Sequence, residues 1–167
     1  MTADRSSFDD FVHARAAALG RTAYLLTGDH HRGEDLLQTA LMQAARHWER
    51  IHTSPEAFVR RTMYHKNISW WRRRRFAESP LDHSSEHDAA GVETDPTVRL
   101  TLDRALARLT VKQRTVLVLR FYEDLTETQT AAALGISPGT VKSTTRHALA
   151  RLRALAPELS DLIGADA

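Results

Sequence analysis

Residues 55–75, PEAFVRRTMYHKNISWWRRRR, combine aromatic and basic side chains in a way that suits binding to nucleic acid. Arginines hold phosphates, and aromatic rings stack on unpaired bases. The same residue types also serve protein interfaces, so a helix with a buried face and a solvated basic end is the alternative. Which of the two applies depends on how a helix over these residues distributes its side chains.

The predicted helix over 55–75 has a core-facing side and an outward side. Thr53 or Ser54 can cap it, and Pro55 and Glu56 suit its first turn. The residues expected to seal against a core are Phe58, Val59, Thr62, Met63 and Trp70. The residues expected on the other faces are Arg60, Asn67 and Arg74, then Arg61, His65 and Arg72, with Tyr64, Ile68 and Trp71 between them and opposite the core.

A second stretch, residues 126–152, is typical of a helix-turn-helix. Thr126 and Gln129 have capping-box spacing, Gly135 supplies a sharp turn, and Ser137 and Pro138 begin another helix. That helix points Val141, Ala148, Leu149 and Leu152 inward. It leaves polar side chains outside for a major groove: Thr140, Lys142, Ser143, Thr145, Arg146 and His147. A purely structural helical hairpin is the alternative.

The remaining chain also predicts helices, so the expected fold class is all-α. Among 167 residues, 7 glycines and 5 prolines are few, and apolar residues recur at three and four positions. Helices are predicted over 6–26, 31–50, 98–109 and 111–122, the last with Thr110 as its cap and Phe121 on its apolar side. The helix over 31–50 is expected to bury Leu37, Ala40, Leu41, Ala44, Trp48 and Ile51. Its acidic and amide face is either plain solvent surface or a protein-docking site: Glu34, Asp35, Gln38 and Gln43.

The net charge of +2 hides a strong partition along the chain. Residues 1–75 carry +5, residues 76–97 carry −6, and residues 98–167 carry +3. Two basic blocks that flank an acidic connector suggest two surfaces for a polyanion. The connector, FAESPLDHSSEHDAAGVETDPT, lacks periodicity and is predicted to be a flexible linker.

Several classes of function are disfavoured. The chain has no cysteine, which removes disulfides, thiol catalysis and thiolate zinc sites. His83 and His87 are four residues apart, but in a Ser/Asp/Gly segment they are weak candidates for metal binding. No carboxylate cluster and no nucleophile beside a base is evident, so an enzyme is not expected. No basic start precedes an apolar run and no stretch approaches a membrane span, which predicts a cytoplasmic protein.

Four blocks of the chain, in this order, resemble the small, SigE-like, two-domain members of the extracytoplasmic-function (group 4) sigma factors of bacterial RNA polymerase. The blocks are RGEDLLQTAL (32–41), PEAFVRRTMYHKNISWWRRRR (55–75), LTVKQRTVLVLRFYEDLTETQTAAALG (109–135) and ISPGTVKSTTRHALARLR (136–153). The resemblance implies a region 2 domain over 1–75, a linker over 76–97, a region 4 helix-turn-helix domain over 98–156 and a tail over 157–167.

In that family region 2 binds the polymerase clamp helices and opens the −10 promoter element, region 4 recognises the −35 element, and the linker follows the path of the nascent transcript. The resemblance therefore implies docking through Glu34, Asp35, Leu36 and Gln38. It implies contacts to the −10 strand by Arg60, Arg61, Tyr64, His65, Asn67, Trp71 and Arg72, and contacts to the −35 duplex by Thr140, Lys142, Ser143, Arg146 and His147. No catalysis, metal or cofactor is implied.

Two departures bear on regulation and specificity. The family often has asparagine at the position of His65, so the preferred −10 bases do not transfer. The chain stops soon after the helix-turn-helix, so no sensor domain is expected, and such members are often controlled from outside by an anti-sigma protein. The competing interpretation is a free-standing helix-turn-helix regulator, in which residues 1–75 form an effector or dimerisation domain.

Overall fold

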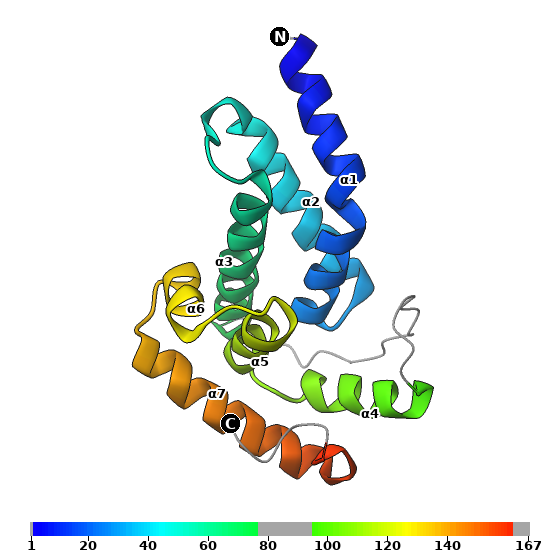
Figure 1. Cartoon of the computed structure of the whole chain (residues 1–167). Helices are drawn as coiled ribbons and strands as arrows, with labels where there is room; N and C mark the ends of the chain where they lie inside the picture. Colours follow the sequence, from blue (N-terminus) through cyan, green and yellow to red (C-terminus); the bar gives the residue numbers. More distant parts are fainter. Residues whose placement is uncertain (1, 77–94, 162–167) are drawn as a thin grey trace. The chain divides into compact units, whose positions relative to one another are not determined.

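The computed structural model describes residues 2–76 and 95–161. Within these ranges all regular structure is helical, so the predicted all-α fold is confirmed. The chain divides into two compact units, Met1–Ser79 and Pro80–Ala167, and each has its own core (Figure 1). The predicted linker lies mostly outside the described residues, except at its ends. There Phe76 still belongs to a helix of the first unit, and Pro96 begins a helix of the second.

The first unit is built from three long helices. They are α1 (Thr2–Thr27), α2 (His30–Arg46) and α3 (Pro55–Phe76), with a short 3-10 helix, η1 (Trp48–Arg50), after α2. α2 packs against both other helices, and α1 also contacts α3 (Figure 1). Their completely buried side chains form the core: Leu19, Thr22, Ala23, Leu26, Leu36, Ala40, Ala44, Val59 and Met63. Burial of these apolar side chains is the main stabilising term of the unit.

Local signals fix the ends of these helices. The Asp29 side chain accepts a hydrogen bond from the backbone N–H of Arg32 at 2.9 Å, which caps α2. Of the two predicted caps for α3, Ser54 is the one used, because its Oγ accepts from the N–H of Ala57 at 3.2 Å. The prediction that α2 runs to residue 50 is wrong: α2 ends at Arg46.

The shortened end of α2 brings Trp48 to α1. The Trp48 ring lies 5.1 Å from the Phe8 ring in an edge-to-face arrangement, and 5.4 Å from the Phe11 ring. Its Nε1–H donates to Ser7 Oγ at 2.9 Å. A regular helix through residue 50 would carry this ring elsewhere, so tertiary packing decides where α2 ends.

In the part of the second unit that the structure describes, residues 95–161, there are four α-helices and a closing 3-10 turn. These are α4 (Pro96–Ala107), α5 (Val111–Leu117), α6 (Glu127–Leu134) and α7 (Pro138–Leu155), followed by η3 (Pro157–Leu159). Thr110 and Thr126 both form the predicted capping boxes, with Gln113 and Gln129. Gly135 has φ +67°, the left-handed conformation that ends α6, and Ser137 caps α7. The predicted helix-turn-helix is confirmed.

A π-helical turn (η2, Val118–Tyr122) interrupts the predicted helix over 111–122. Phe121, expected on the apolar side, is 58% exposed, so that prediction is wrong. A π turn inserts one residue into the helical repeat, which rotates the following side chains away from the core. The buried stretch therefore stops at Leu119.

Gly33 allows α1 and α2 to approach closely. A Cβ at this position would lie 3.2 Å from the backbone N of Tyr24 and 3.3 Å from the backbone C of Ala23. We expect Gly33→Ala to lower the free energy of unfolding of the first unit by about 1–3 kcal/mol, because two helix backbones must separate. Urea titration followed by tryptophan fluorescence measures this, since Trp48, Trp70 and Trp71 all lie in the first unit.

Gly20→Ala is the matched control in α1. A Cβ there would meet only Leu37 Cδ2, at 3.9 Å, an ordinary van der Waals distance. Replacing this helical glycine should be neutral or stabilise by roughly 0.5–1 kcal/mol. Equal losses from both substitutions would contradict the close approach at Gly33.

Candidate nucleic-acid interfaces

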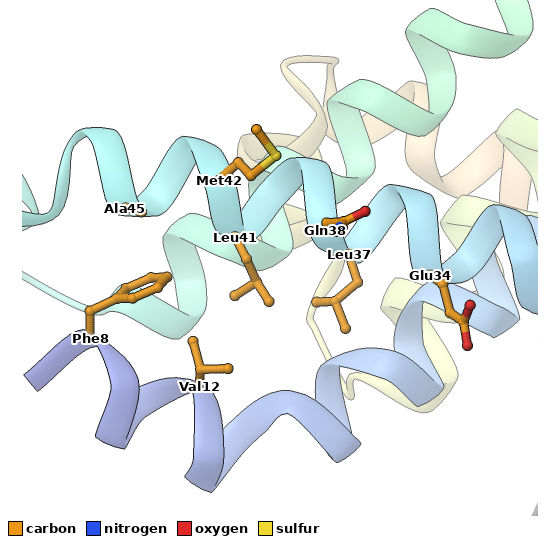
Figure 2. Close-up of a pocket in the computed structure, with 8 residues that line it drawn as sticks. All are labelled: Phe8, Val12, Glu34, Leu37, Gln38, Leu41, Met42 and Ala45. Carbon is orange, nitrogen blue, oxygen red and sulfur yellow. The ribbon is translucent and has the colours of Figure 1, made fainter. Parts of the chain in front are cut away.

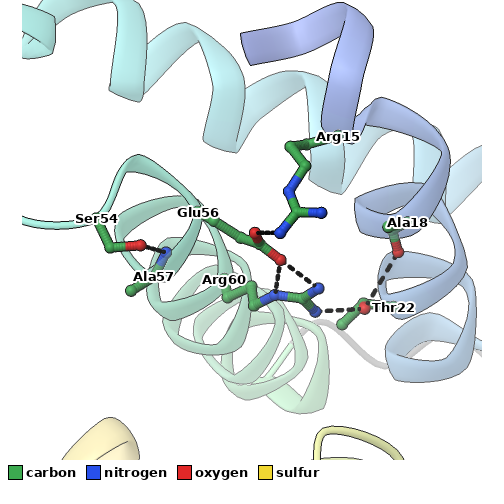
Figure 3. Close-up of polar contacts among 7 residues, drawn as sticks. All are labelled: Arg15, Ala18, Thr22, Ser54, Glu56, Ala57 and Arg60. Carbon is green, nitrogen blue, oxygen red and sulfur yellow. Dashed lines mark hydrogen bonds and ion pairs between the residues drawn. The ribbon is translucent and has the colours of Figure 1, made fainter.

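One polar stripe of α3 faces α1 and is occupied by intramolecular contacts. Arg60 Nη1 donates to Thr22 Oγ1 at 2.8 Å, and Arg60 Nε and Nη2 donate to Glu56 Oε1 at 3.1 and 2.8 Å. Arg15 forms an ion pair with the other Glu56 oxygen (Figure 3). Further along, Asn67 Nδ2 donates to the backbone carbonyl of Leu26 at 3.1 Å. Residues 56, 60 and 67 thus meet successive turns of α1.

The Leu26 carbonyl lies in the last turn of α1, where helix carbonyls lack intrahelical partners. Asn67 supplies that partner and is itself only 7% exposed. Tyr64, predicted to lie opposite the core, is 3% exposed, and that placement is wrong. The physical reason is that α3 packs against two helices, so its buried sector is wider than its apolar residues indicate. Tyr64 and Asn67 have no surface for an unpaired base.

The remaining surface of α3 is basic and is open to solvent. Arg61, His65 and Arg72 lie within about 40° of one another on a face turned away from the polar stripe, and Arg73 is exposed beside them. Trp71 lies one turn beyond Asn67 on the line of the polar stripe, and at 41% exposed it leaves a large part of the indole available for stacking. Four of the seven residues predicted to hold the −10 strand are therefore exposed: Arg61, His65, Trp71 and Arg72.

α2 presents an acidic and amide surface beside an apolar groove. Glu34, Asp35 and Gln38 are exposed as predicted, but Leu36 is completely buried and cannot contact a partner. The groove has a volume of about 480 Å³ and lies between α1 and α2 (Figure 2). Its lining is mostly apolar: Phe8, Val12, Glu34, Leu37, Gln38, Leu41, Met42 and Ala45. Leu37 and Leu41, predicted to be buried, are half-buried walls of this groove.

α7 exposes basic side chains near its N-terminal end. Lys142, Arg146 and His147 are exposed, while Thr140 and Ser143 are half-buried. Ser143 Oγ donates to the Thr140 carbonyl at 3.1 Å. Thr145 was predicted outside, but it is 8% exposed and its Oγ1 donates to the Val141 carbonyl at 2.8 Å. Thr145 follows Val141 and precedes Leu149 by four residues, so it shares their core-facing stripe.

Neither unit shows a metal centre or a membrane helix in the part of the chain that the structure describes. No group of three or more His, Cys, Asp or Glu residues is arranged to hold a metal ion in residues 2–76 and 95–161. No helix in those ranges is long and apolar enough to cross a membrane. His83 and His87 lie outside them.

Both units match known families. Residues 5–77 match Sigma-70 region 2, and residues 99–152 match Sigma-70, region 4. The chain is 41% identical to the RNA polymerase sigma-E factor of Streptomyces coelicolor over 148 residues, which cover 87% of this chain and 84% of that protein. It is 32% identical to the ECF RNA polymerase sigma factor SigL of Mycobacterium tuberculosis over 151 residues, 86% of this chain and 85% of that one.

The chain belongs to the extracytoplasmic-function sigma factors of RNA polymerase. It is a promoter-specificity factor for transcription initiation, a class of non-enzymatic transcription factors. The family resemblance and the function drawn from the four sequence blocks are therefore confirmed.

Solved structures agree on the fold of this sigma factor. The sigma factor RpoE, in its co-crystal structure with the anti-sigma factor NepR from Bartonella quintana, matches with a TM-score of 0.73 and 23% identity, covering 90% of this chain and 97% of that one. The structure of CnrH in complex with the cytosolic domain of CnrY matches with a TM-score of 0.61 and 21% identity, covering 92% and 90%.

The Glu56 carboxylate gives the first unit a pH dependence. Burial raises the pKa of Glu56, but hydrogen bonds from Arg60 and Arg15 outweigh it and hold the pKa below its ordinary value. A carboxyl with a lowered folded-state pKa stabilises the fold above its unfolded pKa, and this stabilisation is lost as pH falls through the folded pKa. We expect Glu56→Gln to lower the free energy of unfolding of the first unit by about 1 kcal/mol at neutral pH.

The difference in unfolding free energy between parent and Glu56→Gln should shrink as the pH falls below the ordinary range of a glutamate. Urea titrations at several pH values, followed by tryptophan fluorescence, measure it. A difference that stays constant down to the acid limit would mean that the ion pairs of Glu56 contribute nothing.

Proposed function

We propose that the Met1–Ser79 unit docks on core RNA polymerase and holds the −10 non-template strand, while the Pro80–Ala167 unit recognises the −35 element. The observation that carries this proposal is that α3 binds α1 through a polar stripe and still exposes a basic face, with the Trp71 ring exposed one turn beyond that stripe. A protein that only binds duplex DNA has no use for exposed rings on a basic helix, whereas promoter melting needs a surface for unstacked bases.

Docking is assigned to α2. Glu34, Asp35 and Gln38 offer acceptors and an amide on one exposed side, and the adjoining groove offers apolar surface. A partner helix with basic and apolar residues suits both. Leu36 is withdrawn as a contact and assigned to the core.

The −10 strand is assigned to Arg61, His65, Trp71 and Arg72. Arginines on this face are suited to phosphates, and Trp71 is suited to a base. Because His65 stands where the family often has asparagine, it is assigned to base selection at this element. Arg60 is a positioning residue, held by Glu56 and Thr22, and Tyr64 and Asn67 are assigned to the fold.

The −35 duplex is assigned to α7. Arg146 and Ser143 are one turn apart and are suited to base edges, and Lys142, about 100° round the helix from Ser143, is suited to a phosphate. His147 and Thr140 complete the proposed contact surface, whose members all retain some exposure.

Five broader assignments accompany these sites. The protein is proposed to catalyse no reaction itself and to bind no cofactor, and to work in the cytoplasm beside its polymerase. The acidic connector is proposed to lie along the transcript path. An anti-sigma protein is proposed as a regulator, supported by the similar fold of the sigma factor RpoE, which was crystallised with the anti-sigma factor NepR.

A reconstitution with core polymerase tests this function. The protein, core polymerase and a promoter pre-melted at −10 should form a stable complex, whereas the protein alone should bind the duplex promoter weakly. In the same assay Asp35→Ala with Gln38→Ala should weaken core binding and leave the helical content unchanged, because both side chains are exposed.

Gln43→Ala is the control for that double variant. Although the sequence grouped Gln43 with the polar face of α2, its amide is half-buried and lies about 140° round the helix from Gln38, outside the proposed surface. Its affinity for core polymerase should match that of the parent. Tight, specific binding of the free protein to duplex promoter would favour a free-standing regulator, and unchanged core binding by the double variant would remove the docking assignment.

Trp71 should matter for melting. Stacking on an unpaired base is worth roughly 1–3 kcal/mol. We expect Trp71→Ala to reduce open-complex formation on duplex promoters far more than on pre-melted ones, as measured by permanganate reactivity. Tyr64→Ala is the contrast, because the Tyr64 ring is buried. It should lower the stability of the first unit and reduce open-complex formation equally on duplex and pre-melted promoters. Equal losses from Trp71→Ala on both templates would assign this residue to packing.

Arg146 and Lys142 should differ in what they contribute. Arg146→Ala should weaken binding to the cognate −35 sequence by on the order of 1–3 kcal/mol. It should also reduce the differences in affinity among −35 sequences that vary at one position. Lys142→Ala should weaken binding to all −35 sequences alike. It should lower the slope of log affinity against log salt concentration by about one. Transcription from a panel of −35 variants measures both, and the reverse result would mean that α7 is rotated differently on the DNA.

A further inference from the structure

α7 carries positive charge along its whole length. Its cations are Lys142, Arg146, Arg151 and Arg153, and the helix contains no Asp or Glu. A solvated helix face usually pairs cations with acids three or four residues away. The sequence of α7 supplies no acid at these spacings, and only its N-terminal half is used by the proposed −35 contacts.

The C-terminal half of α7 meets two further arginines from α4. Arg151 Nη2 donates to the backbone carbonyl of Arg108 at 3.0 Å, and Arg108 is the residue that ends α4. Arg104 lies one turn earlier on the same helix, and all three arginines are exposed. Among the described residues, none of the three forms an ion pair with an acid.

The bond from Arg151 explains only part of this arrangement. A carbonyl at the end of α4 lacks an intrahelical partner, and an arginine near a helix C-terminus is favourable there. That contact uses one N–H of a guanidinium that has five. It leaves Arg104 and the side chain of Arg108 unexplained.

The arginine cluster is continuous with the proposed −35 surface. Thr140, Thr144, His147 and Arg151 follow one another at intervals of four, three and four residues, so they share one face of α7 within a sector of about 60°. None of them is buried. Arg151 is about 6 Å along the helix axis from His147. A helix in a major groove has a phosphate backbone on each side, within reach of such side chains.

We infer that Arg104, Arg108 and Arg151 form a phosphate-binding patch that extends the −35 interface from α7 onto α4. Its ligand is the sugar-phosphate backbone that flanks the −35 element. The patch supplies affinity and orientation without sequence information. This inference rests on the proposed role of α7. Continuity with that surface favours DNA over an acidic protein segment as the ligand.

The test uses holoenzyme assembled with core polymerase and promoter DNA at several salt concentrations. The variant Arg104→Ala with Arg108→Ala removes two guanidiniums and keeps the backbone carbonyl that Arg151 binds. It should lower the slope of log affinity against log salt concentration by about two, and it should weaken binding to every −35 sequence by the same factor. On a template that ends downstream of the −35 element it should match the parent.

Two controls make the result specific. Arg99→Ala removes the same charge from the first turn of α4, about 13 Å from Arg108, and should leave the slope unchanged. Methylphosphonate substitution of single phosphates beside the −35 element should weaken the parent at the patch positions and have no further effect on the double variant.

Several outcomes would overturn the patch. These are an unchanged salt slope, an altered ranking of −35 sequences, or an equal loss on the template without the −35 element, which would indicate an acidic protein partner. Arg146→Ala, measured in parallel, distinguishes failure of the patch from failure of the proposed role of α7. If it alters the ranking while the double variant leaves the slope unchanged, only the patch fails. If it has no effect, the proposed role of α7 fails.

Discussion

The contact between α3 and α1 is the constraint on which the first unit depends. One stripe of polar residues on α3 faces α1 instead of solvent. Its members Glu56, Arg60 and Asn67 are bound by Arg15, Thr22 and the Leu26 carbonyl, respectively. These bonds set the rotation of α3 about its own axis. Once this stripe faces α1, the rotation leaves Arg61, His65 and Arg72 in solvent, and Trp71 is exposed one turn beyond Asn67, which meets the last turn of α1. The proposed strand-binding surface is therefore a consequence of an intramolecular polar contact.

Arginine serves several purposes in this protein, and its position in the fold separates them. Arg60 is held by intramolecular bonds, Arg114 is 6% exposed within α5, and Arg151 binds a carbonyl at the end of α4. Arg146 and Arg61 are exposed on helix faces that have no such bond. A guanidinium with intramolecular partners stabilises the fold, whereas an exposed one without an acid partner remains available to a polyanion.

Much of the fold could be predicted because its signals are local. Capping boxes at Thr110 and Thr126, the left-handed Gly135 and the Ser137–Pro138 helix start each involve residues a few positions apart. The inward residues of α7 also followed from the helical repeat, except Thr145, whose hydroxyl is satisfied by the preceding turn. The π turn at Val118–Tyr122 was missed, because nothing in the local sequence marks the extra residue that exposes Phe121.

The sequence by itself determined the helical class, the family and the helices that carry its candidate interfaces, since composition, caps and short motifs need no knowledge of long-range contacts. Only the tertiary structure decided which side chains on those helices reach solvent. Leu36, Tyr64 and Asn67 are buried because α2 and α3 each pack against two neighbours, which widens the buried sector beyond the apolar residues. The arginine cluster of α4 and α7 was likewise invisible, because its members come from segments more than 40 residues apart that meet only through the shared core.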